Sequence, residues 1–384
     1  MGTNLTTVAL PWFVLATTGS TAKMGLVLAC QTLPALALGI PSGSVVAALG
    51  ARRSLILGDA LRAPLIASVP LLHAAGVLTF PLLLGLVTVT GIFSVPYAAA
   101  SSSLLPEVVG ENEREVARAQ AALQITIQVT GILGPIAAGL LIPLFGAARL
   151  LYFDGVSYAL AALIVLCFVR RAGNPVPPPE RRRGVLAGVR YVFADRLLAS
   201  IVAVATAAHV ALAALFATLP ALAFREFQDA RVAGILFGAD AAGSVLGGIA
   251  ALRLARRVPP LRLGVTGFGL MAAPVWLLAF GQSIPVAIGV MFAFGVGGPL
   301  GVVPIGALLT TRAPAEVRPK VVAGFLSISS AGTPIGAAFT GYLIASAGFD
   351  VTYLGIAAIM TLATILLVWC TREFAPSVPA TAPG

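Results

Sequence analysis

Apolar segments of about 20 residues recur along almost the whole chain, separated by short loops that carry arginine. A helix of about 20 residues matches the thickness of the hydrocarbon core of a bilayer. The pattern therefore predicts an all-α integral membrane protein with about twelve transmembrane helices in two sets of six. The predicted spans are 5–18, 24–49, 54–76, 79–105, 118–145 and 148–169, followed by 199–224, 231–253, 261–281, 284–308, 320–346 and 350–371.

The composition agrees with a protein whose solvent is the bilayer. Hydrophobic residues make up 59% of the 384 residues, charged residues make up 10%, and the mean hydropathy is +1.00. A soluble protein normally carries about 25% charged residues, so this chain has too few to stay dispersed in water. The sequence has no phosphate-binding loop, no Gly-x-Ser-x-Gly motif and no paired cysteine motif. We therefore expect a protein that is not an enzyme and that uses no cofactor and no metal.

Two segments interrupt the series of spans. Residues 170–183 hold four prolines and five arginines, which cannot form a continuous helix. Residues 184–196 are mixed and basic, which is typical of a helix lying on the membrane surface. The predicted organisation is an N-terminal six-helix bundle at 1–170, a cytoplasmic linker with a surface helix at 171–198, a C-terminal six-helix bundle at 199–372, and a disordered tail at 373–384.

The basic residues fall mainly on one side of the predicted spans. Of 24 lysines and arginines, 20 lie on the side of the central linker, and only Lys23, Arg149, Arg225 and Arg231 lie on the other. Positively charged loops stay in the cytoplasm, so both termini and the linker are expected there. The net charge of +10 is then explained by this topology and by anionic lipid headgroups, with no nucleic acid as a partner.

Several short features recur in the same order in the two halves. The pairs are Leu10-Pro11 with Leu219-Pro220, Gly43 and Arg52-Arg53 with Gly247 and Arg256-Arg257, Pro96 and Pro106 with Pro304 and Pro314, and Gly134-Pro135 with Thr333-Pro334. Ordered matches within corresponding spans indicate a duplication. Duplicated halves that face each other are how alternating-access transporters are built.

These residues resemble the major facilitator superfamily, in particular its branch of drug, macrolide and siderophore exporters. The loop after the second span, PSGSVVAALGARRSLILGD, keeps Gly43, Arg52 and Arg53 of a motif of that family. In the fifth span GPIAAG, with Gly134, Pro135 and Gly139, is similar to the Gly-Pro-x-x-Gly-Gly motif of the exporters. The resemblance covers nearly the whole chain. It implies a secondary active transporter of the major facilitator fold.

Three departures from that family bear on mechanism. Ala47 stands where the family has an aspartate that ties the two halves together on the cytoplasmic side. The fourth span lacks the buried arginine of many proton-coupled drug antiporters. The chain opens almost inside its first span, without the short basic segment that normally precedes it, so we expect that its start is misassigned or truncated.

Polar side chains are scarce in the spans, and each needs a partner or a wet surface because lipid offers none. Gln120, Gln124 and Gln128 recur every four residues and form one stripe, which is expected to line a central cavity or to bond to another helix. Gln31 is a weaker candidate for the same cavity. Small residues around Gly134 and Gly139 favour close approach of a second helix, and Pro135 allows bending.

The acidic residues in the spans are the candidates for ion coupling. Asp240, near the middle of the eighth span, has no cation three or four residues away and is expected to be the deepest charge in the chain. It is the candidate proton-coupling residue, and a structural hydrogen bond is the alternative. Asp59 and Arg62 stand three apart and are expected to pair as a structural latch, with a role in transport as the alternative. Asp154, near the outer end of the sixth span, is expected to be interfacial.

The predicted function is proton-coupled export of an amphipathic or hydrophobic small molecule by a monomer in the cell membrane. Uptake or carriage of a lipid-like substrate, and a transport-inactive sensor or scaffold of the same fold, remain open. A membrane-embedded transferase would need a convergent set of catalytic groups, and the sequence shows only dispersed aspartates and histidines.

Overall fold

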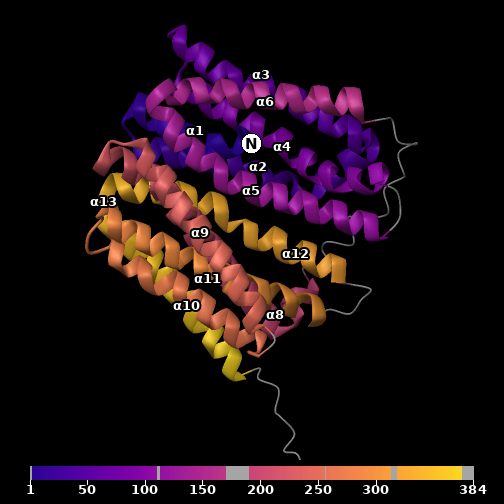
Figure 1. Ribbon diagram of the computed structural model, residues 1–384, viewed down its shortest axis with the longest axis vertical. Coiled ribbons are helices and arrows are strands. Elements are labelled where there is room, and N and C mark those ends of the chain that lie inside the picture. Colours follow the sequence, from indigo (N-terminus) through magenta and orange to yellow (C-terminus); the bar gives the residue numbers. More distant parts are fainter. Residues whose placement is uncertain (1, 110–112, 170–189, 256, 313–317, 374–384) are drawn as a thin grey trace, which may run out of the picture.

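The computed structural model describes residues 2–109, 113–169, 190–255, 257–312 and 318–373, and it is built from helices (Figure 1). Most of the predicted linker and nearly all of the predicted tail lie outside the described residues. The N-terminal half comprises α1 (Gly2–Thr18), α2 (Thr21–Leu49), α3 (Ala51–Ala74), α4 (Phe80–Val109), α5 (Glu113–Phe145) and α6 (Ala147–Phe168). The C-terminal half comprises α8 (Arg196–Leu222), the π-helical turn η1 (Ala223–Phe227), α9 (Ala230–Leu254), α10 (Pro260–Leu278), α11 (Ile284–Arg312), α12 (Arg318–Ser330) and α13 (Gly332–Glu373).

Ten helical segments of the described chain are long and apolar enough to cross a membrane. One of the ten, Gly324–Cys370, has 47 residues, which is more than twice the length that a single crossing needs. Gly348 divides it, because its φ of 83° and ψ of −178° are incompatible with a helix. Helix α1 has 17 residues and is shorter than each of the ten.

Short turns join consecutive helices and make them antiparallel neighbours. The turn between α1 and α2 is closed by Ser20, whose hydroxyl accepts a hydrogen bond from the backbone N–H of Lys23 at 3.3 Å. Asp229 caps α9 in the same way, through the N–H of Arg231 at 2.9 Å. We call the end of the molecule that carries the turns at Gly19, Gly146 and Gly348 the hairpin end. The opposite end, where α2, α6 and α9 finish, is the linker end.

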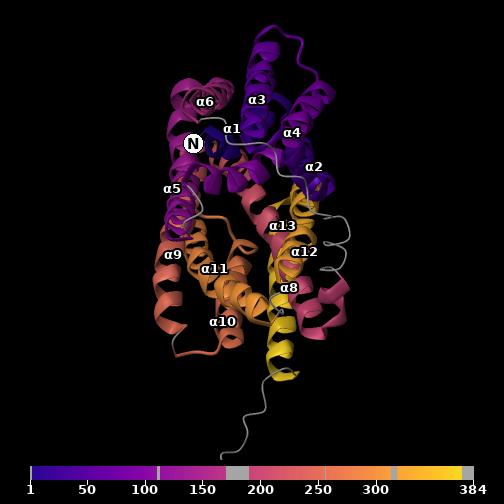
Figure 2. The ribbon, with the colours of Figure 1, turned by 90° about the vertical axis from the view of Figure 1, so that its right-hand side faces the viewer.

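The helices gather in two groups that meet along two seams. Within the N-terminal half, α3 packs on α4 and α6, α2 packs on α4, and α1 packs on α5 and α6. Within the C-terminal half, α8 packs on α13, α9 on α11, and α10 on α11 and α13. The two groups occupy the upper and lower parts of both ribbon views (Figures 1 and 2). The seams between the halves are α2 with α13 and α5 with α9.

Large apolar side chains cover the outside of the helices. Leu252 of α9 is 77% exposed and Phe168 of α6 is 80% exposed, and many leucines, isoleucines and valines on other helices are also exposed. A surface of this kind is stable against lipid and not against water. The prediction of an all-helical membrane protein is therefore confirmed.

The described part of the predicted surface helix is the short helical stretch 190–194. Its Val192 is fully buried and packs with Leu198 and Val202 of α8 and Val321 of α12. Asp195 then caps α8, because its carboxylate accepts from the backbone N–H of Leu197 at 2.8 Å. This stretch is thus anchored on the C-terminal half.

Candidate functional site

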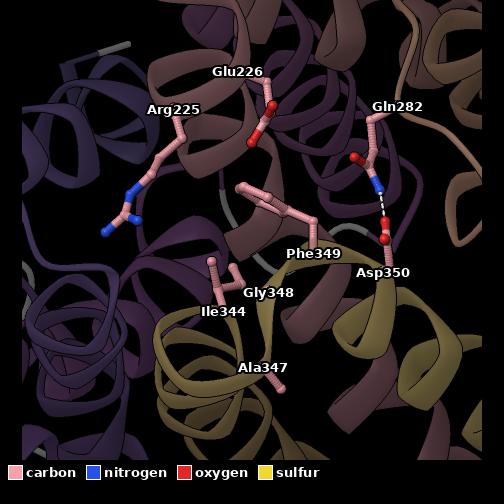
Figure 3. A pocket seen from close by; sticks show the side chains of 8 residues that line it. All are labelled: Arg225, Glu226, Gln282, Ile344, Ala347, Gly348, Phe349 and Asp350. Atoms are coloured by element: carbon pink, nitrogen blue, oxygen red, sulfur yellow. Dashed lines mark hydrogen bonds between the residues drawn. The ribbon is translucent and has the colours of Figure 1, made fainter.

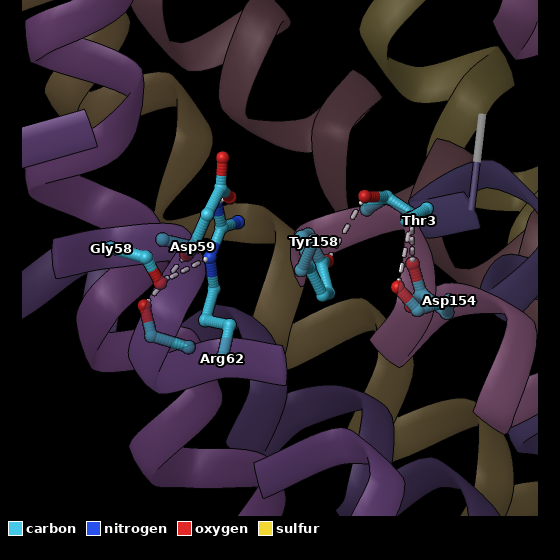
Figure 4. Close-up of polar contacts among 9 residues, drawn as sticks. Thr3, Gly58, Asp59, Arg62, Asp154 and Tyr158 are labelled. Atoms are coloured by element: carbon cyan, nitrogen blue, oxygen red, sulfur yellow. Dashed lines mark hydrogen bonds and ion pairs between the residues drawn. The ribbon is translucent and has the colours of Figure 1, made fainter. Parts of the chain in front are cut away.

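A buried charged cluster lies inside the N-terminal half. Asp59 and Arg62 of α3 are 1% and 4% exposed and form the ion pair expected from their spacing. The Arg62 Nε also donates to the carbonyl oxygen of Gly58 at 3.1 Å (Figure 4). The rings of Tyr97 and Tyr158 cover the guanidinium, with centroids 4.2 Å and 4.4 Å from its central carbon. Cation–π contacts of this kind stabilise a desolvated guanidinium.

Asp154 of α6 completes this cluster from the side of α1. Its Oδ2 accepts a hydrogen bond of 2.5 Å from the hydroxyl of Thr6, and its Oδ1 lies 3.4 Å from the hydroxyl of Ser157. One helical turn along α6, the hydroxyl of Tyr158 bonds to that of Thr3 at 3.0 Å (Figure 4). Helices α1, α3, α4 and α6 therefore converge on one polar centre in an apolar bundle. We call Asp59, Arg62, Tyr97, Asp154 and Tyr158 the acidic cluster.

The sequence-based placement of two acids was wrong. Asp154 was expected at the interface, but it is fully buried, because it lies two turns inside α6 and faces α1 and α3 instead of the headgroups. Asp240 was expected to be the deepest charge, but it is only half-buried, and Asp59, Arg62 and Asp154 are buried more completely.

Asp240 lies in the C-terminal half, outside the acidic cluster. It is in the middle of α9, and its backbone carbonyl faces Gly295 of α11 so closely that any side chain at Gly295 would collide with it. Its carboxylate has no hydrogen bond or ion pair with any residue that the structure describes. A half-buried carboxylate without a cation must be hydrated or protonated, which keeps Asp240 a candidate for proton binding.

The three glutamines of α5 are exposed, and none forms a hydrogen bond with a described residue. The direction of their face follows from helix geometry, which repeats about every 3.6 residues. Ala138, which is fully buried, lies five full turns after Gln120 and therefore on the same face of α5. Gly139 lies about three turns after Gln128 and shares its face in the same way. Gly139 meets α9 of the other half. The glutamines therefore point to the side of α5 that faces the C-terminal half.

Gln31, the fourth cavity candidate, is not part of the α5 stripe. It is half-buried on α2, which packs on α4 and α13. Its backbone carbonyl oxygen lies against Gly91 of α4, where a side chain would not fit. The structure therefore shows Gln31 at a packed helix crossing and gives its amide no described partner.

Two pairs of glycines bring the halves into backbone contact. A Cβ built on Gly139 of α5 would lie 2.8 Å from the Cα of Gly234 of α9, and one on Gly25 of α2 would lie 2.8 Å from the Cα of Gly341 of α13. Gly134 makes a similar close contact within the N-terminal half, against Asn4 of α1. The small residues of the fifth span thus pack at an interface as expected. Pro135 is buried there, and its carbonyl lies against Gly234.

Replacing Gly139 with leucine should push the two halves apart at the hairpin end. The new side chain meets the backbone of α9, which cannot move aside alone, so an overpacking cost of about 1–3 kcal/mol is expected. Thermal unfolding in detergent measures it. Gly131→Leu is the matched control, because Gly131 lies on the same helix with no atom within 4 Å of the point where a Cβ would stand, and it should change little. Equal losses in both variants would contradict the prediction.

The predicted motif residues of the α2–α3 turn act within the N-terminal half. Arg52 donates from Nε to the carbonyl of Val169 at 2.6 Å and from Nη2 to that of Leu166 at 2.7 Å. It therefore caps the end of α6, where free carbonyls attract a cation. Arg53 is exposed, and Gly43 is half-buried in α2.

A polar cavity of about 260 Å³ lies at the hairpin end (Figure 3). Arg225, Glu226, Gln282, Phe349 and Asp350 contribute to its lining, and the amide of Gln282 donates to Asp350. The guanidinium of Arg225 also donates to the carbonyl of Gly19 at 2.9 Å, which joins the two halves. The hairpin end is therefore held together by a polar contact as well as by the glycine pairs.

The comparison with known families decides the class of the protein. The family described as transmembrane secretion effector matches residues 1–378. The chain belongs to this family. It is a branch of the major facilitator superfamily, so the predicted resemblance to that superfamily's efflux branch is confirmed. The protein is a multi-pass membrane transporter and not an enzyme.

Relatives cover the whole length of the chain. The multidrug efflux pump Tap of Mycobacterium tuberculosis is 26% identical over 391 residues, which is 99% of this chain and 90% of Tap. The enterobactin exporter EntS of Citrobacter koseri is 27% identical over 319 residues, 76% of this chain and 71% of EntS. A bacterial homologue of the human lysosomal transporter Spinster, in an inward-facing and unoccupied conformation, has a TM-score of 0.77 at 16% identity, and the match covers 97% and 94% of the two chains. This last likeness concerns the fold alone.

Proposed function

We propose that this transporter exports an amphipathic or hydrophobic small molecule from the cell in exchange for protons. It works as a monomer, by alternating access between halves at residues 1–170 and 199–372. Each half has six spans, because α1 adds a span to the ten candidates and the break at Gly348 makes two spans of Gly324–Cys370. The linker at 171–198, the tail at 373–384 and both termini lie in the cytoplasm, by the distribution of basic residues.

The arrangement of the glycine pairs is the observation that carries this proposal. Gly25 and Gly234 each lie four residues after the start of their helices, and Gly341 and Gly139 each lie seven residues before a turn glycine, Gly348 or Gly146. The two seams therefore correspond to each other under an approximate two-fold relation. Pairs of halves related in this way rock about a central site in alternating-access transporters.

The position of the contacts supports an inward-facing state. The glycine pairs and the Arg225–Gly19 bond lie at the hairpin end, which the orientation rule places outside the cell. Gln120, Gln124 and Gln128 lie on the linker-end part of α5 and are exposed. An exposed polar stripe that faces the other half fits a cavity open to the cytoplasm.

The relatives support export as the direction and an organic molecule as the cargo. Tap is named a multidrug efflux pump and EntS an enterobactin exporter. In this chain the stripe of three amides lies among apolar residues of α5, and such a surface suits an amphipathic substrate better than an ion.

The proposal is tested first with a susceptibility panel of unrelated drugs and siderophores, in a host that lacks its own pumps. Expression of the chain should raise resistance to at least one amphipathic compound. That compound is then loaded into proteoliposomes, where an imposed pH gradient should drive its transport. Uptake that increases sensitivity would support the reverse direction, and the absence of any flux would support a sensor or scaffold.

Ala47→Asp should shift the population toward the outward-facing state. In the resembled superfamily the aspartate at this position ties the halves together at the cytoplasmic side, and charge-assisted hydrogen bonds contribute about 1.5–3 kcal/mol. In a cysteine-free background, labelling of Ile136→Cys at the α5–α9 seam should rise, and labelling of Gln124→Cys should fall. Ala47→Asn is the uncharged control. Unchanged labelling would mean that other contacts set the balance.

A further inference from the structure

The acidic cluster contains two acidic side chains and one basic side chain. Asp59 and Asp154 are 1% and 0% exposed, and Arg62 is the one guanidinium among the described residues that acts on both. Helix α1 carries no charged side chain, and α5 carries none between Gln120 and Phe145. Among the residues that the structure describes, the other titratable groups that face the cluster are the phenols of Tyr97 and Tyr158. With both carboxylates ionised, Arg62 leaves one buried negative charge uncompensated.

The hydrogen bonds indicate which of the two carboxylates is left without a compensating positive charge. The guanidinium of Arg62 contacts Oδ1 of Asp59 directly, and a guanidinium can only donate. The adjacent positive charge favours the ionised form of Asp59, because the contact is then an ion pair and not a hydrogen bond to a neutral acid. Asp154 instead accepts from hydroxyl groups, those of Thr6 and Ser157. A hydroxyl both donates and accepts, so the 2.5 Å contact with Thr6 survives, with its direction reversed, when Asp154 binds a proton.

We propose that Asp154 is a proton-binding site of the N-terminal half, with Asp59 and Arg62 as a permanently ionised pair beside it. The proton forms an O–H bond on a carboxyl oxygen of Asp154, comes from water and returns to water. This inference deepens the proposed proton exchange and rests on it. It adds a site in the half opposite to that of Asp240.

Movement of the two halves can change the hydrogen bonds of Asp154. Its hydroxyl partner, Thr6, lies on α1, which packs on α5 and α6 of its own half and also contacts α8 and α9 of the other. Tyr158 is tied to the same helix through Thr3. A displacement of α1 during rocking would break the bond between Thr6 and Asp154 and expose the carboxyl to water. Proton binding at Asp154 is in this way linked to the position of α1.

Infrared difference spectroscopy of the purified protein in lipid nanodiscs tests the site without any substrate. In an Asp240→Asn background, where Asp240 contributes no signal, a pH titration should show the C=O stretch of a protonated buried carboxylic acid, which Asp154→Asn removes. Asp59→Asn should remove it too, because Asp154 then becomes the sole counter-ion of Arg62 and ionises. Asp350→Asn, at an exposed position, should leave the band in place. A band that survives Asp154→Asn, or that persists in Asp59→Asn, would overturn the proposal.

A milder variant keeps the test decisive if the asparagine variants do not fold. Thr6→Val preserves the shape of the side chain and removes its hydrogen bond, so the band should move to higher frequency and its titration midpoint should shift. An unchanged band and midpoint in folded Thr6→Val would also overturn the assignment. Because the band is measured without transport, its loss or persistence is independent of whether a pH gradient drives efflux, which tests the proposed function separately.

Discussion

Arg62→Gln should destabilise the folded protein by about 3–5 kcal/mol, the cost of leaving buried charge without its partner. The substitution removes the ion pair with Asp59 and the positive charge that acts on Asp154. It also removes a cation that packs between the rings of Tyr97 and Tyr158. Thermal unfolding of the purified protein in detergent, together with its yield from membranes, measures the loss.

Two further variants separate charge from packing. Arg53→Gln changes the same residue type earlier on the same helix, at an exposed position, and should alter stability by less than about 0.5 kcal/mol. The double variant Arg62→Gln with Asp59→Asn should recover part of the loss, because one of the two unpaired carboxylates is gone. If Arg62→Gln is as stable as the parent protein, the cluster is hydrated and the account of a desolvated charge centre is wrong.

The sequence predicts the helices well because lipid imposes a simple rule on them. A spanning helix must be apolar for about 20 residues, so the ranges 148–169 and 261–281 differ by at most three residues at either end from α6, Ala147–Phe168, and α10, Pro260–Leu278. The break between α12 and α13 inside the range 320–346 was missed, although Pro334 marks it. Proline lacks an N–H and fits the first turn of a new helix, such as that of α13.

The polar centre could be predicted only where its members share a helix. Asp59 and Arg62 stand one turn apart on α3, so their pairing follows from helix periodicity. The partners of Asp154 and Arg62 lie on α1, α4 and α6, and the sequence contains no information on which helix faces turn toward one another. The depth of Asp154 was misjudged for the same reason. A residue near the end of a span in sequence is interfacial only if its side chain turns to the headgroups.

The acids of the two halves lie in different surroundings. The acidic cluster is buried, contains an ion pair and is bonded to α1, whereas Asp240 of α9 has no described partner and is only half-buried. A paired acid can hold its proton through hydrogen bonds that the protein rearranges. An unpaired one responds mainly to water and to substrate in the central space. In the proposed inward-facing state, Asp240 is the acid that we expect cytoplasmic water and the cargo to reach most directly.

Asp240→Asn should abolish export driven by a pH gradient and spare exchange of substrate down its own gradient. Asparagine has nearly the shape of aspartic acid and cannot release a proton, so the variant imitates one protonation state permanently. The backbone contact with Gly295, which holds α9 against α11, is unaffected, so folding and surface expression should remain intact. The expected loss concerns coupling alone.

The two activities are measured in the same proteoliposomes with the compound that the susceptibility panel identifies. Gradient-driven efflux should fall to the level of empty vesicles, while counterflow should stay near that of the parent protein. Asp240→Glu, which keeps a titratable carboxyl, should retain part of the gradient-driven flux, and Ser244→Ala, one turn further along α9, should retain all of it. Loss of both activities in the asparagine variant would indicate a structural role in packing or substrate binding. Full gradient-driven efflux without the carboxylate would exclude Asp240 from coupling and favour the acidic cluster around Asp154 as the site that binds the exchanged proton.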